Sequence, residues 1–405
     1  MNQRIQVHEL APWVHELNRL GALERAVMVH DIQRMTDRVA TLQEAFPADT
    51  LHAIAIKANP LVQVLRRLVQ TGVGLEAASW EEVDLARAAG CPGERIVFDG
   101  PAKTDDELAA ALELGGVINV DHGGELERLK AMGAPKNARI GLRVNPQIGA
   151  GSIGFTSTVS RKSKFGVPLS EAAKWVQAYP FITGLHVHTG SQGCGLDLLC
   201  AAAEVTGQAV IDLGLDWLDV GGGIPVRYTD RDPEPPSVQA WADGLAQGAA
   251  WGRVPLVTEV GRHIHAGAGV TLSRIEAVKD VDGQRMLVVH VGADLLLRRV
   301  YRPDDWDHDI VVLAPDGTLK SGAPEPTTIG GPLCFAGDIL ARDRSLAPAE
   351  RGDLLLIRDT GAYTLSMWSR HCSRGKPAVY GAENGGLSLL YRGESPSDVV
   401  RSWSL

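Results

Sequence analysis

The sequence has no run of about 20 apolar residues, the length that a membrane-spanning helix needs, and its first residues lack the apolar core of a secretion signal. Its 49 acidic residues outnumber its 40 lysines and arginines, and the basic residues are scattered. Neither a nucleic acid nor an anionic membrane is therefore an expected partner. We expect a cytoplasmic protein that binds a small molecule.

Cysteine is also scarce. The five cysteines include no CxxC spacing and are Cys91, Cys194, Cys200, Cys334 and Cys372. An odd set without that spacing predicts neither a disulfide framework nor a zinc site, and we expect no metal. The 405 residues, 44% of them hydrophobic, leave room for one large domain and a smaller one.

The middle of the chain repeats a short apolar strand, a loop and a helical segment with apolar residues three and four apart. Eight strands are predicted, at 51–58, 73–79, 95–100, 117–121, 138–146, 182–191, 215–223 and 254–262. Helices are predicted between them, at 80–90, 104–115, 123–132, 169–178, 197–213 and 238–251. This alternation predicts a closed parallel (β/α)8 barrel of the TIM type rather than an open doubly wound sheet.

After residue 270 the alternation gives way to β-rich segments separated by Gly, Pro and Asp turns. These segments are 270–275, 284–292, 309–313, 353–358 and 376–381. We predict a barrel domain over 30–270 and a C-terminal all-β domain over 271–405. A strand at 26–29, within residues 1–29, is expected to join the β domain.

Active sites of such barrels lie at the carboxyl ends of the strands. Unusual residues stand at these ends: Lys57, Glu76, Ser79, Arg143, Asn145, His188, Ser191, Gly221–Gly223 and Glu259–Arg262. Each alone has an ordinary explanation, such as an ion pair or a buried histidine. Their coincidence at one rim favours a single site.

Lys57 closes a strand of alanine and isoleucine. A lysine at a strand end ordinarily reaches water, but at the mouth of an apolar site its neutral amine can attack an aldehyde as a Schiff-base lysine. A cofactor aldehyde is the permanent partner that fits, and pyridoxal phosphate (PLP) fits the other residues. The glycines allow backbone N–H groups to approach a phosphate, while Glu259 and His188 are candidates for the ring.

An ordered set of motifs resembles the fold-type III PLP-dependent decarboxylases, which include diaminopimelate, ornithine and arginine decarboxylases, with alanine racemase more distant. The motifs are Ile56–Asn59, Leu185–Gln192, Asp219–Gly223, Glu259–Arg262, Gly331–Cys334 and Gly361–Tyr363. The resemblance implies that Lys57 holds PLP, His188 stacks on its ring and Glu259 pairs with its ring nitrogen. The other cofactor-binding candidates are Glu76, Arg143, Ser191, Gly222, Gly223, Gly261, Arg262 and Tyr363.

The resemblance also implies a homodimer in which Cys334 of the other subunit protonates the substrate carbon after carbon dioxide leaves. A carboxylate at the ring nitrogen keeps that nitrogen protonated and favours α-decarboxylation of an amino acid, which releases an amine. Two alternatives stay open. One is an amino-acid racemase on the same fold, which Glu259 and Cys334 disfavour; the other is a non-catalytic PLP-binding regulator, which Lys57 and the full β domain disfavour.

Two positions depart from the family pattern. Phe335 follows the cysteine where the family carries Glu or Asp, and Leu297 stands where diaminopimelate decarboxylases carry an arginine. An aromatic ring cannot hydrogen-bond a distal ammonium, so a different or larger substrate is predicted, for example an intermediate of specialised metabolism. The candidate substrate-binding residues are Arg298, Tyr301, Phe335, Asp338, Arg370 and Arg374.

Overall fold

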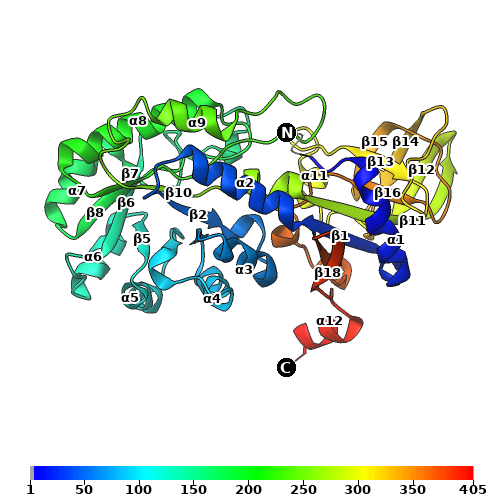
Figure 1. The fold of residues 1–405 in the computed structure, drawn as a ribbon, viewed down its shortest axis with the longest axis horizontal. Coiled ribbons are helices and arrows are strands. Elements are labelled where there is room, and N and C mark those ends of the chain that lie inside the picture. Colours follow the sequence, from blue (N-terminus) through cyan, green and yellow to red (C-terminus); the bar gives the residue numbers. More distant parts are fainter. Residues whose placement is uncertain (1–3, 405) are drawn as a thin grey trace. The chain divides into compact units, whose positions relative to one another are not determined.

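The computed structural model describes residues 4–404. The chain divides into two compact units (Figure 1). The barrel unit comprises residues 36–226 and 234–264. The β unit comprises the residues up to Met35, the segment 227–233 and residues 265–405.

The core of the barrel unit is a ring of eight parallel strands, which confirms the predicted (β/α)8 barrel. Neighbours around the ring follow the order β2, β3, β4, β5, β6, β8, β9 and β10, and β10 pairs with β2 to close it. The strands are β2 (Leu51–Ala55), β3 (Gly74–Ala77), β4 (Ile96–Phe98), β5 (Val117–Val120), β6 (Arg139–Asn145), β8 (Ile182–His186), β9 (Trp217–Asp219) and β10 (Leu256–Thr258). The short β7 (Val167–Pro168) pairs with β6 outside the ring.

Figure 1 shows the helices of this unit outside its strands. They are α3 (Val62–Gln70), α4 (Trp80–Ala88), α5 (Asp105–Leu114), α6 (Gly123–Ala131), α7 (Ala172–Ala178), α8 (Leu196–Leu213) and α9 (Val238–Leu245), while α2 (Ile32–Ala45) and α10 (Arg262–His265) span the unit boundaries. Local sequence sets their ends. Thr104 and Glu107 form a capping box at the start of α5, and Gly115, in the left-handed conformation at φ 74°, ends it.

The observed strands are shorter than the predicted ones at their carboxyl ends. The strand predicted over 51–58 ends at Ala55, and Lys57 lies in a 3-10 turn, Ile56–Ala58, because the chain turns there toward Asn59 and Pro60. The helix predicted over 238–251 ends at Leu245, where Gly244 and Gly248 lower helix propensity.

Inside the barrel, Trp217 of β9 requires glycine on two other strands. A Cβ on Gly184 would lie 2.3 Å from the Trp217 ring, and one on Gly141 would lie 2.5 Å from it. Trp217 belongs to a buried cluster with Leu51, Ala53, Val97, Val117 and Val257. The glycines therefore make room for the largest side chain of this core.

The β unit is built on a nine-stranded sheet. Its strands are β1 (Ala26–Asp31), β11 (Gly269–Val281), β12 (Gln284–Val289), β13 (Ile310–Leu313), β14 (Glu325–Gly330), β15 (Ile339–Leu346), β16 (Leu354–Ile357), β17 (Ala378–Glu383) and β18 (Gly386–Tyr391). The N-terminal β1 lies between β11, to which it is antiparallel, and β17, to which it is parallel. Three helices complete the unit: α1 (Leu10–Arg19), α11 (Leu297–Tyr301) and α12 (Pro396–Ser402).

Helix α1 packs on the sheet of the β unit through one apolar face. Leu10, Val14 and Leu17, spaced three and four apart, are buried in one cluster with Val27 of β1 and Leu272 of β11. No helix within residues 4–404 combines the length and the hydrophobicity that crossing a membrane requires.

Candidate functional site

The carboxyl ends of the barrel strands carry a group of charged and polar side chains. Both carboxylate oxygens of Glu76 accept hydrogen bonds of 2.6 Å from the Lys57 ammonium. Glu76 is fully buried, whereas a third of the Lys57 side chain is exposed. The amine is thus held at the mouth of the barrel by a carboxylate inside it.

A second carboxyl group, Asp99, follows β4 beside this pair. Burial and the charge of Asp99 raise the pKa of Glu76. Although burial opposes it, the charge of Lys57 and a hydrogen bond with Glu76 hold the pKa of Asp99 well below its usual range. The two carboxyl groups therefore behave unequally: Asp99 stays ionised, and Glu76 is the one that can take up a proton.

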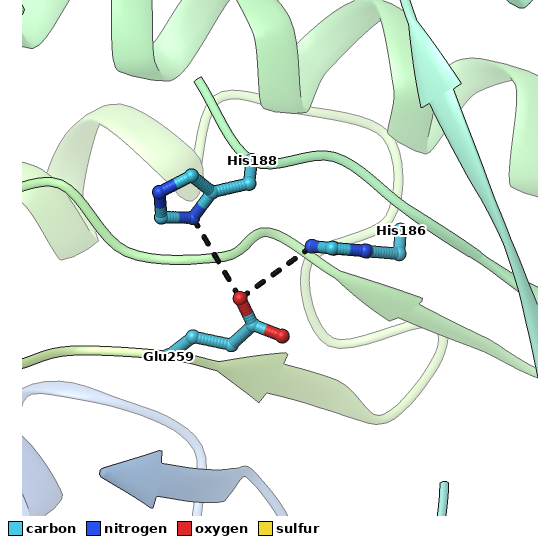
Figure 2. Close-up of side chains that lie close together, drawn as sticks. All are labelled: His186, His188 and Glu259. Atoms are coloured by element: carbon cyan, nitrogen blue, oxygen red, sulfur yellow. Dashed lines mark ion pairs between the residues drawn. The ribbon is translucent and has the colours of Figure 1, made fainter. Parts of the chain in front are cut away.

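Glu259, directly after β10, lies between two histidines: His186, the last residue of β8, and His188, two residues later (Figure 2). Its Oε2 is 3.5 Å from Nε2 of His186 and 3.6 Å from Nδ1 of His188. Burial lowers the pKa of His186 to about 4, and burial with the charge of Lys57 lowers that of His188 well below its usual range. Both imidazoles are therefore neutral near pH 7.

The Glu259 carboxylate is fully buried, and its oxygens have no cationic hydrogen-bond donor within residues 4–404; its neighbours are the two neutral imidazoles and the Asp219 carboxyl group. Burial first, and then the charge of Asp99, raise its pKa to about 8. A buried carboxylate in this condition is stabilised by a cationic N–H partner. The three ligand atoms of Glu259, His186 and His188 lie within 4.8 Å of one another, so their geometry alone is also compatible with a cation.

The loop after β9 contains glycines that no other residue can replace. Gly221 has φ 65°, and a Cβ on Gly222 would lie 2.2 Å from the carbonyl oxygen of Glu259. Asp219 Oδ1 accepts a 2.8 Å hydrogen bond from Gly221 N–H, and the Gly222 N–H donates to His188 Nδ1 at 3.3 Å. The loop is a compact backbone turn of the kind that surrounds phosphate groups.

A hydroxyl and a guanidinium stand on the neighbouring strand ends. The Ser191 hydroxyl accepts hydrogen bonds from Nε of Arg262 at 3.1 Å and from its Nη2 at 3.0 Å. On β6, the guanidinium of Arg143 lies 4.2 Å from the centre of the Phe165 ring, and its Nε lies 3.8 Å from Asp121. The rim therefore combines hydrogen-bond donors and positive charge, which suits an anion.

In the β unit, Cys334 lies on an exposed turn that Asp338 holds in place. Asp338 is buried, and its carboxylate accepts 2.7 Å hydrogen bonds from the N–H groups of Ala293 and Leu333. The Cys334 N–H donates to Sγ of Cys372 at 3.5 Å. The carboxylate thus fixes the chain on which the cysteine stands.

Three rings stack beside this cysteine. The Phe335 ring is nearly parallel to those of Tyr301 and His371, with interplanar angles of 10° and 18° and centroid distances of 6.0 and 5.3 Å. Tyr301 is 55% exposed, His371 is exposed and Phe335 is half-buried. A Cβ on Gly337 would lie 2.8 Å from the Phe335 ring, so this glycine lets the ring lie flat on its turn.

The arginines of the β unit have partners of their own. Arg370 pairs with Glu394 through two contacts of 2.9 Å, and Arg374 pairs with Asp294 at 2.7 Å. The Arg298 guanidinium lies 4.0 Å from the ring centre of Trp306 and 5.3 Å from that of Tyr363, and it donates to the Tyr363 carbonyl at 3.1 Å.

A family model described as "Pyridoxal-dependent decarboxylase, pyridoxal binding domain" matches residues 32–266, more than half of the chain. The chain belongs to the pyridoxal-dependent decarboxylases. It is a PLP-dependent enzyme that decarboxylates an amino acid, as its motifs predicted. Nothing found supports the racemase or the non-catalytic regulator.

The relatives of this decarboxylase agree over nearly its whole length. It is 33% identical to a diaminopimelate decarboxylase of Zymomonas mobilis, covering 89% of this chain and 87% of the relative. It is 35% identical to one of Pseudomonas aeruginosa, covering 87% and 83%. Among solved structures, the diaminopimelate decarboxylase of Helicobacter pylori complexed with L-lysine has a TM-score of 0.87 and 28% identity, covering 96% of this chain and 99% of that one.

The residues at the barrel rim fit the cofactor of this family. Lys57 offers an amine to an aldehyde, and the buried Glu259 carboxylate lacks the N–H partner that a protonated pyridine nitrogen provides. The close-packed glycine loop would let a phosphate approach the backbone, and the Ser191 hydroxyl and the Arg262 guanidinium would donate to it.

The structure brings together the predicted barrel residues and adds three that the sequence left unassigned. Lys57 contacts Glu76, His188 contacts Glu259, and the charge of Lys57 acts on Glu259. Asp99, His186 and Asp219 were missed. Asp99 stands at a strand end, where the same criterion would have found it.

The predicted substrate residues lie together in the β unit, but most already have internal partners. Asp338, Arg370 and Arg374 are held by backbone or ion-pair contacts, while Tyr301 and Phe335 present ring faces. Their contacts with a substrate stay predictions. The ion-pair partners of Arg370 and Arg374 were not apparent from the sequence because they lie 24 and 80 residues away.

Proposed function

We propose that this decarboxylase binds PLP at the rim of the barrel unit, with Lys57 at its aldehyde, Glu259 at its ring nitrogen, His188 at its ring face and the phosphate at the glycine loop. The observation that carries the proposal is the buried Glu259 carboxylate, which has no cationic hydrogen-bond donor, in the same rim as a lysine held at the barrel mouth. When bound, PLP supplies the electron sink that accepts the electron pair left by departing carbon dioxide.

Lys57 and Glu76 form a proton-transfer pair. The ammonium must lose a proton before its nitrogen can react, and Glu76 lies 2.6 Å from that nitrogen. The raised pKa of Glu76 makes it a competent acceptor, while the ionised Asp99 beside it keeps the proton nearby. Glu76 thereby lets Lys57 alternate between the amine and ammonium forms.

Glu259 and the two histidines control charge at the far end of the ring. Because His186 and His188 are neutral, Glu259 is the group here that can balance a protonated ring nitrogen. A cationic N–H partner would lower the raised pKa of Glu259 and keep the carboxylate ionised. His188 offers a neutral ring face to the cofactor.

The proposal assigns different tasks to the predicted domains. Residues 30–270 bind the cofactor, and residues 271–405, joined by the strand within residues 1–29, supply Tyr363 to the phosphate and Cys334 as the proton donor. We further propose that the enzyme is a cytoplasmic homodimer in which Cys334 of the partner subunit completes each site. The turn fixed by Asp338 and the exposure of Cys334 support a thiol presented outward.

The test is to incubate purified protein and PLP with amino acids and to trap labelled carbon dioxide. Diaminopimelate, the substrate named for the relatives, is the reference compound. Wild type is expected to show an imine absorbance band that disappears on borohydride reduction and is absent in Lys57→Ala. Lys136→Ala, an exposed lysine of the same unit, is the control and keeps the band. A wild-type protein without the band contradicts the proposal.

A further inference from the structure

We propose that the substrate of this decarboxylase ends in an uncharged aromatic ring, which stacks on the rings of Tyr301, Phe335 and His371. This inference rests on the proposed function, because it takes Cys334 as the proton donor. Phe335 is the next residue, so the stack lies one residue from the thiol that must reach the α-carbon. The part of the substrate beyond that carbon is therefore within reach of these rings.

The carboxylates around this turn already have partners, which argues against a distal ammonium. Asp338 accepts from two buried backbone N–H groups. Asp294 is buried and pairs with Arg374, and Glu394 pairs with Arg370. An ammonium brought to this turn would share carboxylates whose charge is already engaged by an arginine or by two buried N–H groups, so it would gain less from them than from a free carboxylate.

The cations of the same region are equally occupied, which argues against a distal carboxylate. Arg374 donates to Asp294 and to the carbonyl of His290, and Arg370 is bound by both oxygens of Glu394. Arg298 lies on the rings of Trp306 and Tyr363. Because the charged groups of both signs are engaged internally, an uncharged group can bind this surface without separating an ion pair.

The ring stack itself supplies the attraction. Its rings are parallel within 18°, and Tyr301 at one end is 55% exposed, so a further planar group can extend the stack. Gly337, beneath Phe335, makes this a built surface rather than a loose side chain. The L-lysine bound by the Helicobacter pylori relative ends in an ammonium, so this chain is expected to differ from it in substrate.

Binding of product amines separates this inference from the proposed function. Phenethylamine and tyramine are titrated against cadaverine and putrescine on the PLP-loaded enzyme, following the cofactor absorbance. Carbon dioxide release from phenylalanine, tyrosine and tryptophan is compared with release from lysine, ornithine and diaminopimelate. The aromatic amines are expected to bind about twofold to tenfold more tightly than cadaverine, the factor that one stacked ring contributes.

Variants of Phe335 assign the preference to the stack. Phe335→Leu is expected to weaken phenethylamine binding by about threefold to tenfold and to leave cadaverine unchanged, because it keeps an apolar side chain without the ring. Phe335→Glu is expected to reverse the order of the two amines. Trp175→Leu, which disrupts a stacked pair with Tyr179 in the barrel unit, is the control and changes neither affinity.

The outcomes are distinguishable. A wild-type enzyme that binds cadaverine more tightly than phenethylamine, or a Phe335→Leu variant that binds both as wild type does, overturns the inference while decarboxylation stands. Absence of the cofactor band in wild type overturns the proposed function instead. A wild-type enzyme that shows the cofactor band but binds neither aromatic amine also overturns the inference.

Discussion

The carboxylate of Glu259 is buried beside two neutral imidazoles, and under the proposal its cationic N–H partner is the ring nitrogen of PLP. Such a group acts through its negative charge rather than through its shape. The neighbouring Asp99 and the burial of the site already oppose that charge. The energy of an N–H partner is therefore realised only when Glu259 is ionised.

Glu259→Gln removes the charge and keeps the size. We expect the Lys57-dependent absorbance band to persist, because the aldehyde contact is elsewhere, and kcat to fall by about 100-fold to 1000-fold, the usual cost of one stabilising group in a preorganised site. Steady-state carbon dioxide release measures this. The control is Glu82→Gln, in which the amide oxygen can still accept from the Ala78 N–H. A Glu259→Gln enzyme within about threefold of wild type would contradict the role.

Candidate residues at strand ends could be predicted because active sites of TIM-type barrels lie at the carboxyl ends of the strands. Lys57 and Glu259 were found this way. His186 was quoted within a motif without a role, since nothing local shows that its ring would face Glu259. Arg370 and Arg374 drew attention as charges, and only the fold reveals that Glu394 and Asp294 bind them.

At the scale of elements, one carboxylate joins two turns of the β unit. Asp338 accepts from Ala293 after β12 and from Leu333 after β14. A Cβ on Gly292 or on Gly331 would lie 2.3 Å from its carboxylate oxygens, so both turns pack directly on it. The position of the turn that carries Cys334 is thus fixed by the strands that Asp338 joins rather than by the turn's own residues.

Asp338→Ala is expected to destabilise the protein by about 2–6 kcal/mol, because it leaves two buried N–H groups without acceptors at roughly 1–3 kcal/mol each. Asp338→Asn keeps one acceptor oxygen and is expected to lose about half as much. Urea unfolding followed by circular dichroism measures both. Asp304→Ala, at an exposed position of the same unit, serves as the control. Equal stability of Asp338→Ala and wild type would show that the two turns are stable without this carboxylate.

Sequence patterns identified mainly the strands that are apolar and buried. All eight barrel strands came from short apolar runs, and six strands of the β unit were anticipated, namely β1, β11, β12, β13, β16 and β17. The missed strands of the β unit are β14, β15 and β18, and the short β7 of the barrel unit was missed as well. β15 carries Arg342, Asp343 and Arg344 within it, and β14 reads Glu-Pro-Thr-Thr-Ile-Gly, so neither shows an apolar period.

At the scale of the whole molecule, the decisive pairings join distant parts of the chain. β10 closes the barrel against β2, and β1 enters the β unit between β11 and β17. No local pattern states these partners, because each strand would look the same beside another neighbour. The count of eight strand–helix repeats predicted that the barrel closes, and the strand at 26–29 was expected in the β domain without its neighbours being named.

The two units divide the proposed machinery between them. Lys57 and Glu259 belong to the barrel unit, and Cys334 belongs to the β unit. If the partner subunit's Cys334 completes each site, a chain without Lys57 and a chain without Cys334 must together form an active mixed dimer. Lys57→Ala and Cys334→Ala proteins are therefore mixed, dissociated and reassociated with PLP, and carbon dioxide release is measured.

Random pairing makes half of the dimers mixed, and each mixed dimer has one intact site of two, so about a quarter of the wild-type specific activity is expected. If each chain held a complete site of its own, no mixed dimer would contain an intact one, and activity would not exceed that of the parents. Lys57→Ala mixed with Glu259→Gln is the matched control: both changes lie in the barrel unit, so every site stays defective. Rescue in the first mixture and not in the second assigns Cys334 to the neighbouring subunit.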